Sequence, residues 1–328
     1  MFLPLFFAFC GFTAAPSDFP PIRPAHTFSI VARDKTTGEI GVAVQSHWFS
    51  VGSLVPWAEA GVGAVATQSF VEASYGPLGL DLMRAGKTAP EALAGLIRAD
   101  ADEAVRQVGM VDAAGRAAAH TGRKCIAAAG QYVGDGFTCQ ANMMLKPTVW
   151  KAMADAFQAA EGELSDRLVA ALEAAQREGG DIRGRQSAGL IVVKAKASGA
   201  PWKDRIYDLR VEDHPDPIGE IKRLLRTAKA YNHMNEGDAL LTAGRPAEAM
   251  KEYSLGMEIY PDNPEMIFWP AVTMASTGKV EDSLPLFRRV FAADPNWMEL
   301  LRRLPAVGQF PDDQALLKRI LAVGPSGR

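Results

Sequence analysis

Apolar and polar positions alternate along the chain from Thr27 onward. The run TFSIVARD, residues 27–34, ends at the turn KTTGE, and the run IGVAVQSHWF, residues 40–49, then resumes the pattern. Two such runs across a glycine-bearing loop predict a β-hairpin. A third run, GVGAVATQS, follows the break at Pro56. These strands are rich in glycine and alanine. Small residues favour a sheet that is closely covered on both faces, or a strand whose backbone a ligand or another chain segment approaches closely.

Helical periodicity follows these strands, and strand patterns then return. YGPLGLDLMRAG and TAPEALAGLIRAD each place a proline near the start of an apolar helical stripe, and Thr88 is placed to cap the second helix. A second hairpin is predicted around DAAG, and a long helix is predicted from about Thr148 to Arg177, with an interruption near Gly162. GRQSAGLIVV and RIYDLRVED predict the last strands. This order indicates an α+β fold with two packed sheets and helices outside.

A 34-residue repeat marks the C-terminal part. Gly244, Ala249, Tyr253 and Pro261 are matched 34 residues later by Gly278, Ser283, Phe287 and Pro295. Glycine, small, aromatic and proline positions at these offsets are typical of tetratricopeptide (TPR) helical hairpins. A generic bundle of α-hairpins is the alternative. The domain boundary is predicted in EDHPDPIGE, which leaves residues 27–214 to the first domain and 215–328 to the helical one.

The first 17 residues, MFLPLFFAFCGFTAAPS, form an apolar run that turns small and polar. The run is too short to span a bilayer and is typical of a secretory signal peptide, although no Lys or Arg precedes it. The alternative is a coding start placed too far upstream. A signal at 1–17 followed by a proline-rich leader at 18–26 predicts a secreted or periplasmic protein.

Composition excludes some partners. The 328 residues carry 35 basic and 38 acidic side chains, a formal net charge of −3, and no long run of one sign. This balance argues against nucleic-acid binding, which depends on clustered Lys and Arg. Cys125 and Cys139 are expected either to pair, as an oxidising compartment permits, or to remain buried thiols. A nucleophilic Cys139 is the least favoured alternative.

Motif searches predict neither a metal nor a cofactor. The five histidines are widely separated, and the chain contains no HExxH, CxxC or EF-hand spacing. No GxxxxGK[ST] phosphate loop or GxSxG elbow occurs. What remains is a set of amides and hydroxyls inside otherwise apolar strands. Buried polar groups of this kind need hydrogen-bond partners, so the set is a candidate site, unless each member faces solvent or a loop backbone.

Several segments together resemble a known family. From about residue 26 to 218, TFSIVARDKTTGEIGVAVQSHWF, YGPLGLDLMRAG, HTG, GDGFTCQANMM, GGDIRGRQSAGLIVV and DLRVEDHPDP are similar, in order, to the family called domain of unknown function 1028 (DUF1028). The resemblance implies membership of the N-terminal-nucleophile (Ntn) hydrolases. It also implies a four-layer αββα sandwich, in agreement with the two predicted sheets.

The wider superfamily implies a mechanism. Its members expose a Thr, Ser or Cys at a chain terminus, where the hydroxyl or thiol attacks an amide and the free α-amine acts as the base. Thr27 occupies that position here, so a cut after His26 is required. Two departures stand out: Gln45 replaces the acidic residue that proteasome-type members carry, and no Lys lies between Lys35 and Lys87. Arg33 and Arg185 are the cations considered as substitutes.

The candidate site follows from these observations. The catalytic candidates are Thr27, Gln45, Ser46 and Asn142. The substrate-binding candidates are Arg33, Thr67, Gln68, Gln140, Asp181, Arg185, Gln186 and Ser187. Ser46 or Ser187 is the alternative nucleophile that needs no processing.

Two classes of function are open at this point. One is a secreted amidohydrolase that acts on a small amide or peptide-like bond. The other is a non-catalytic domain that binds a small molecule and is attached to a protein-interaction module of TPR-like repeats. A homo-oligomer is compatible with both.

Overall fold

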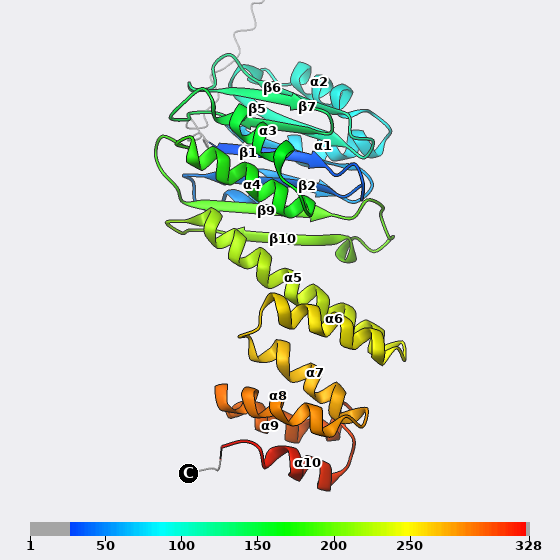
Figure 1. Cartoon of the computed structure of the whole chain (residues 1–328). Coiled ribbons are helices and arrows are strands. Elements are labelled where there is room, and N and C mark those ends of the chain that lie inside the picture. The colour runs from blue at the N-terminus through cyan, green and yellow to red at the C-terminus, as the bar shows by residue number, and fades with distance from the viewer. Residues whose placement is uncertain (1–26, 326–328) are drawn as a thin grey trace, which may run out of the picture.

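The computed structural model describes residues 27–325. It has two parts, a β-sandwich flanked by helices and a helical array below it (Figure 1). The predicted signal peptide and leader lie outside the described residues. In the described part no helix combines the length and the apolar character needed to cross a bilayer.

The larger sheet has six antiparallel strands in the order β10-β9-β2-β1-β8-β7. Its strands are β1 (Thr27–Arg33), β2 (Ile40–Ser46), β7 (Gly130–Gly134), β8 (Phe137–Ala141), β9 (Ser187–Val193) and β10 (Arg205–Val211). β1 and β2 form the hairpin that the alternation predicts. Both lie in the centre of the sheet, and all but the last residue of β1 are buried.

The smaller sheet has four antiparallel strands in the order β3-β4-β5-β6. They are β3 (Pro56–Glu59), β4 (Gly63–Ser69), β5 (Arg106–Asp112) and β6 (Ala117–Thr121). The two sheets pack on each other through a core that includes Val31, Val42 and Val44 from the larger sheet and Ala64 and Ala66 from the smaller. Because the smaller sheet contributes mainly small side chains, the sheets can approach closely.

Helices cover the outer face of each sheet, which completes the expected four layers. α1 (Tyr75–Arg84) and α2 (Ala89–Ala99) pack on the smaller sheet, and α3 (Val149–Ala159) and α4 (Leu164–Arg177) pack on the larger. Thr88 forms the predicted cap of α2, since its hydroxyl accepts from the Glu91 amide and the Glu91 carboxylate accepts from the Thr88 amide. The predicted long helix is divided into α3 and α4 at Gly162, which has φ 95°.

The C-terminal part is a series of antiparallel helices. They are α5 (Pro217–Thr242), α6 (Pro246–Ile259), α7 (Pro264–Ser276), α8 (Val280–Ala293), α9 (Asn296–Arg303) and α10 (Gln314–Leu321). Gly244 and Gly278 take the left-handed backbone between paired helices, at φ 73° and 86°. Tyr253 and Phe287, which occupy equivalent positions in the two repeats, are buried between those helices. The TPR-like organisation predicted from the 34-residue repeat is therefore present.

α5 belongs to both parts of the molecule. Its first turns place Ile218, Ile221 and Leu225 in the core between the larger sheet and its helices. Further along the same helix, Met234 and Leu240 enter the core of the helical array. The boundary expected after residue 214 therefore falls just before a continuous helix that joins the two parts, and no flexible linker separates them.

Candidate functional site

Thr27 lies at one end of the sandwich, in the layer between the two sheets. It opposes Ser46 of β2, and Ser46 opposes Ser187 of β9. Directly opposed residues of antiparallel strands point to the same face, which here is the face that carries Val31, Val42 and Val44. Three hydroxyl side chains therefore form a row across β1, β2 and β9. All three are fully buried.

The carbonyl of Thr27 is held from two directions. It accepts from Gln68 Nε2 of the smaller sheet at 3.1 Å, and from the Asn142 backbone amide at 3.2 Å. A longer contact of 3.4 Å joins it to Asn142 Nδ2. Two of the predicted site residues thus contact the predicted nucleophile through its backbone.

A network of buried amides extends from this point through the layer between the sheets. Gln68 Nε2 donates to Gln107 Oε1 at 2.7 Å, which also accepts from Asn142 Nδ2 at 2.8 Å. Ser29 donates to Gln68 Oε1 at 2.6 Å and accepts from Gln140 Nε2 at 2.7 Å. Because each of these bonds joins different strands, the polar set ties the two sheets together.

The network ends at the edge of the sandwich. Gln107 Nε2 donates to Thr121 Oγ1 and to the Ala141 carbonyl, both at 2.9 Å. Thr121 in turn donates to Gln131 Oε1 at 2.8 Å. The sequence analysis did not select Gln107 and Gln131, although RQVGMV and GQYVG show the same signal of an amide within an apolar strand.

Gly109 makes this close approach of the sheets possible. A Cβ atom at residue 109 would lie 2.4 Å from Gln140 Oε1 and 2.5 Å from Thr138 Oγ1, distances that no side chain tolerates. The glycine therefore leaves room beside β5 for the Gln140 amide, whose Oε1 accepts from Thr138 at 2.9 Å.

Gln45 points away from Thr27. It opposes Phe28, whose side chain lies in the core under α3 and α4, so Gln45 faces the helices and not the layer between the sheets. Its amide is fully buried, and neither Nε2 nor Oε1 has a hydrogen-bond partner among the described residues. This placement separates the Gln45 side chain from the Thr27 hydroxyl by the thickness of the sheet.

Three other candidates have local roles. The Ser187 hydroxyl donates to the Trp48 carbonyl and accepts from the Val51 amide at 3.0 Å, which fixes the loop after β2. Thr67 lies on the helix-facing side of β4 and donates to the Glu72 carbonyl at 3.1 Å. Arg33 ends β1, about 20 Å from Thr27 at the usual rise of an extended strand.

A charged pair lies beside the hydroxyl row. Asp181, buried before β9, accepts from Arg183 Nη2 at 2.7 Å and from Arg183 Nε at 3.1 Å. Its Oδ2 also accepts from the His47 amide at 3.2 Å, and His47 directly follows Ser46. The pair is therefore held next to the strand end that carries Ser46.

Gln186 and Arg185 belong to the same loop. The Gln186 amide donates to the Ser46 carbonyl at 3.1 Å. Arg185 is half-exposed, pairs with Asp216 at 3.4 Å and presents its carbonyl to His47 Nδ1. Of the two cations considered from the sequence, only Arg185 lies at the Thr27 end of the sandwich, and Arg183 is a third cation there.

Strained backbone is concentrated at this end. Three described residues other than glycine have positive φ: Ser50 at 57°, Ser69 at 72° and Met143 at 55°. Ser69 ends β4, Met143 follows Asn142, and Ser50 lies in the loop after β2. Left-handed backbone at residues that carry a Cβ persists only where surrounding contacts enforce it, and it is concentrated at functional sites.

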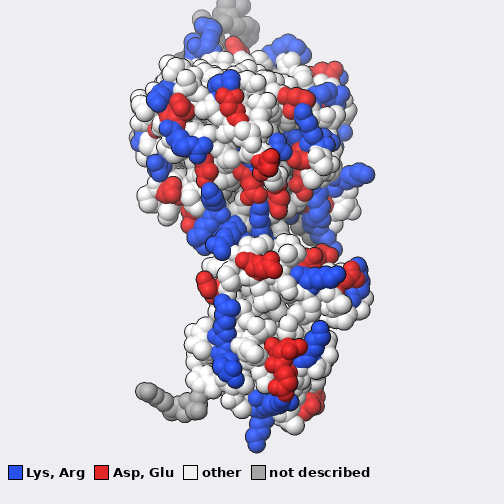
Figure 2. All heavy atoms as spheres, in the orientation of Figure 1, with Lys and Arg blue, Asp and Glu red and all other residues white. Residues whose placement is uncertain are grey.

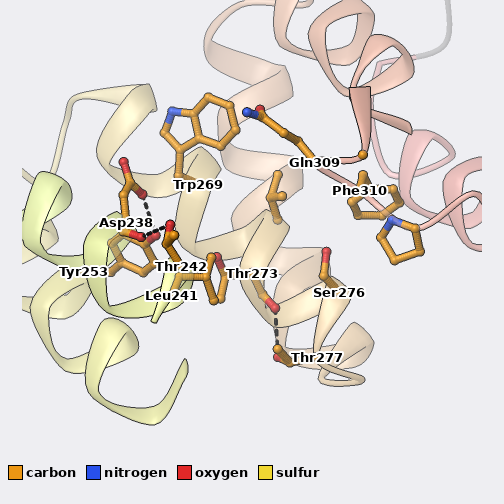
Figure 3. A pocket seen from close by; sticks show the side chains of 13 residues that line it. Asp238, Leu241, Thr242, Tyr253, Trp269, Thr273, Ser276, Thr277, Gln309 and Phe310 are labelled. Carbon is orange, nitrogen blue, oxygen red and sulfur yellow. Dashed lines mark hydrogen bonds between the residues drawn. The ribbon is translucent and has the colours of Figure 1, made fainter. Parts of the chain in front are cut away.

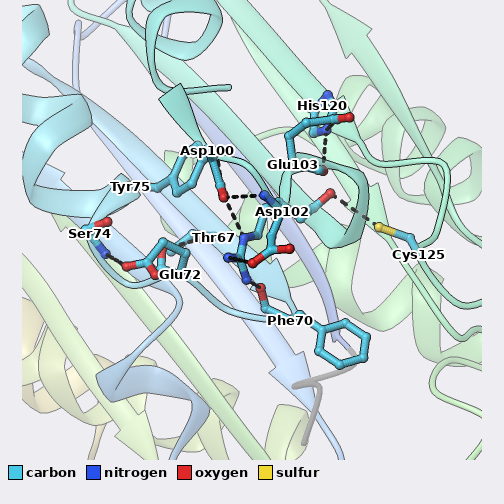
Figure 4. A network of polar contacts seen from close by, with 11 residues as sticks. Thr67, Phe70, Glu72, Ser74, Tyr75, Asp100, Asp102, Glu103, His120 and Cys125 are labelled. Atoms are coloured by element: carbon cyan, nitrogen blue, oxygen red, sulfur yellow. Dashed lines mark hydrogen bonds and ion pairs between the residues drawn. The ribbon is translucent and has the colours of Figure 1, made fainter. Parts of the chain in front are cut away.

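A second polar cluster borders the end of β4 (Figure 4). Arg106 donates to Asp100 Oδ2 and to the Phe70 carbonyl, both at 2.8 Å, and Tyr75 donates to Asp100 at 3.1 Å. Burial acts to raise the pKa of Asp100, but hydrogen bonds from Arg106 and the Asp102 amide outweigh it and hold the pKa below its ordinary value. Asp100 therefore stays ionised and fixes the loop before β5.

The two cysteines are not paired. Cys139 is fully buried under α3 and α4, and burial raises the pKa of its thiol well above the ordinary value. Cys125 lies in the segment between β6 and β7 and donates to the Arg106 carbonyl at 3.3 Å. The structure thus has the arrangement of two free thiols, and the raised pKa of Cys139 disfavours a nucleophilic role.

The described residues contain no group of three or more His, Cys, Asp or Glu side chains arranged to hold a metal ion. On the visible face of the sandwich, acidic and basic side chains are interspersed (Figure 2). The end of the sandwich that carries Thr27 brings together hydroxyls, amides, the Asp181–Arg183 pair, His47 and Arg185.

Comparisons with known proteins give a consistent result. Residues 27–221 match the model of a family of unknown function, DUF1028. The crystal structure of protein SPO2555 from Silicibacter pomeroyi, described as a DUF1028 protein, is 30% identical. The aligned region covers 62% of this chain and 90% of the SPO2555 chain, with a TM-score of 0.56.

A shorter similarity concerns tetratricopeptide repeats. Tetratricopeptide repeat protein 8 from Caenorhabditis elegans is 31% identical over 86 residues, which are 25% of this chain and 15% of that protein. This match agrees with the helical array.

The DUF1028 model matches residues 27–221, which are more than half of this chain. The chain therefore belongs to the DUF1028 family.

Proposed function

We propose that the sandwich is an amide hydrolase whose nucleophile is Thr27, active once the bond between His26 and Thr27 has been cut. The position of Thr27 is the main support: it is the first residue of β1, and its side chain faces the layer between the sheets beside Ser46. The family match also begins at residue 27.

The proposed reaction has two steps. The Thr27 hydroxyl attacks the amide carbonyl while the free α-amine takes the hydroxyl proton and passes it to the leaving amine. Water then cleaves the resulting ester, releasing the acid and restoring the threonine. An α-amine with an ordinary pKa of about 8 suits this exchange near neutral pH.

Neighbouring groups support the charge that develops in this reaction. Asn142 is held against Thr27, and its side-chain amide would stabilise the oxyanion on releasing its longer 3.4 Å contact with the Thr27 carbonyl; a nearby backbone N–H is the alternative donor. Arg183, which Asp181 holds beside Ser46, would place a guanidinium group near the reaction in a chain that has no Lys between Lys35 and Lys87. Gln186, which is partly exposed beside Ser46, would contribute to binding of a small amide or peptide-like substrate, and the buried Gln68 and Gln140 would hold the strands around Thr27 in place.

A covalent probe tests the proposal without a known substrate. A chain that starts at Thr27 is expected to gain one adduct with a threonine-reactive β-lactone, detected by intact-mass spectrometry and assigned by peptide mapping. The same chain with Thr27→Ser should retain the adduct, and Thr27→Ala should lose it. An adduct that persists in Thr27→Ala would move the nucleophile to Ser46 or Ser187, and no adduct in any variant would remove the hydrolase proposal.

Processing and localisation form a second part of the proposal. Cleavage of a signal peptide near residue 17 and a further cut after His26 would deliver a mature protein outside the cytoplasm. N-terminal sequencing of the protein from its native host checks both cuts. An active protein that retains the leader DFPPIRPAH, residues 18–26, would contradict the requirement for a free Thr27 amine.

The second candidate is a non-catalytic domain that binds a small molecule, joined to a protein-interaction array. It is favoured by the complete burial of Thr27 and by the hydrogen bonds that hold the Thr27 carbonyl. Under this function, a chain that starts at Thr27 would remain unlabelled while its fold stays intact.

A further inference from the structure

A cavity of about 730 Å³ lies on the helical array, away from the hydroxyl row at Thr27 (Figure 3). Its walls come from α5, α6, α7 and the segment that follows the 3₁₀ helix Pro305–Val307. Figure 3 shows Asp238 and Thr242 of α5 on one side, Trp269 of α7 above them and Phe310 across the space. Because several helices contribute, the cavity exists only when the array is folded.

Asp238 is the only charged side chain among the residues that line this cavity. Its Oδ1 accepts from the Tyr253 hydroxyl at 2.6 Å. Burial, together with the Asp238 charge, raises the pKa of Tyr253, so the phenol keeps its proton and holds the carboxylate in place. Within the described part of the chain no Lys, Arg or His forms an ion pair with Asp238.

The remaining walls combine apolar surface with hydroxyl groups. Trp269 packs edge-on against the buried Phe268, with 5.1 Å between ring centroids, which fixes its orientation. Phe310 and Val272 are mostly buried, and Leu241 leaves 37% of its surface exposed. The cavity therefore offers a positioned anion, an aromatic ring and an apolar floor close together.

We propose that this cavity binds an extended segment of a partner protein in which a Lys or Arg lies near an apolar side chain. The cation would approach Asp238 and the face of Trp269, where ion pairing and cation–π attraction act together. The apolar side chain would lie against Phe310 and Val272. The Asp238 charge would repel an acidic segment or a free carboxyl terminus, because the lining contains no basic group to offset that charge.

Panning a random octapeptide display library against the full chain tests this proposal. The expected result is enrichment of peptides with Lys or Arg within a few positions of Leu, Phe, Ile or Met. The strongest peptide, made synthetically and titrated by calorimetry, should bind Asp238→Asn about 10- to 100-fold more weakly, the range for a lost charged hydrogen bond. Its affinity should also fall as salt rises.

Asp238→Asn keeps an oxygen for Tyr253, so the array should stay folded, and circular dichroism checks this. Glu248→Gln is the matched control: it removes one exposed carboxylate of α6 that lies outside the cavity lining, and it should leave the affinity unchanged. The proposal is overturned if no peptide is enriched, if the enriched peptides lack basic residues, or if Asp238→Asn binds as well as the native chain. Binding here does not depend on whether the sandwich hydrolyses amides.

Discussion

Among single residues, Gln45 lies in surroundings that disfavour its polar side chain. Its amide is fully buried among apolar side chains, with no hydrogen-bond partner for either polar atom in the described structure. A buried amide without partners costs about 1–3 kcal/mol of stability. Gln140, one strand beyond β1 and equally buried, instead bonds to Ser29 and Thr138. The two glutamines therefore allow a direct comparison.

Gln45→Leu is expected to raise the free energy of unfolding by about 1–2 kcal/mol, because it removes an unsatisfied amide at nearly constant volume. Gln140→Leu is expected to lower it by about 1–3 kcal/mol, because Ser29 and Thr138 lose their partner. Urea denaturation of both variants measures the difference. If Gln45→Leu proves as destabilising as Gln140→Leu, then Gln45 has a bonding role.

For single residues, the sequence identified amides within buried strands better than it identified the face of the sheet to which each amide points. Gln68, Gln140 and Asn142 were selected as amides within apolar strands, and all three contact Thr27 or the network beside it. Gln45 was selected by the same rule but faces the helices. Both faces of β2 are buried, so the pattern of apolar and polar residues along β2 could not show which face Gln45 occupies.

Among the elements, β5 depends on one small residue for its packing against the larger sheet. Gly109 lies opposite the side chains of Gln140 and Thr138, and a methyl group there would overlap both. The strand was predicted from its apolar pattern. The need for glycine within it was not, because the side chain that approaches belongs to β8, which follows much later in the chain.

Gly109→Ala is expected to lower the free energy of unfolding by about 2–3 kcal/mol, since the sheets must separate or the Gln140 amide must move. Gly95→Ala is the control: it lies within α2, where an added Cβ meets nothing within 4 Å, and it should stabilise by about 0.5–1 kcal/mol. Thermal denaturation compares the two variants. Equal tolerance of both would mean that the sheets are not closely packed at Gly109.

For the whole molecule, α5 decides how the two parts are joined. The proline-rich segment before it suggested a boundary, and α5 begins at Pro217 as a single helix of 26 residues. Ile218, Ile221 and Leu225 complete the core of the sandwich. The sandwich therefore requires the start of a helix whose remainder belongs to the array.

A chain that ends at Asp213 is expected to be unstable or insoluble, whereas one that ends at Asn232 should fold. Removing three buried aliphatic side chains loses about 5–8 kcal/mol of hydrophobic stabilisation, which is comparable with the free energy of unfolding of a whole domain. Circular dichroism melting curves of the two shortened chains give the test. Equal melting temperatures would show that the sandwich does not need α5.

Local patterns in the sequence determined the α+β class, the β1–β2 hairpin, the cap at Thr88 and the TPR-like pairing of the C-terminal helices. Each depends on residues close in sequence or on a fixed repeat, so its physical cause can be seen in one segment. Only the tertiary structure decided that Gln68, Gln107, Gln140 and Asn142 share one layer, that Gln45 leaves it, and that Asp238 and Phe310 line one cavity. These contacts join residues dozens of positions apart, and their geometry depends on how sheets and helices pack.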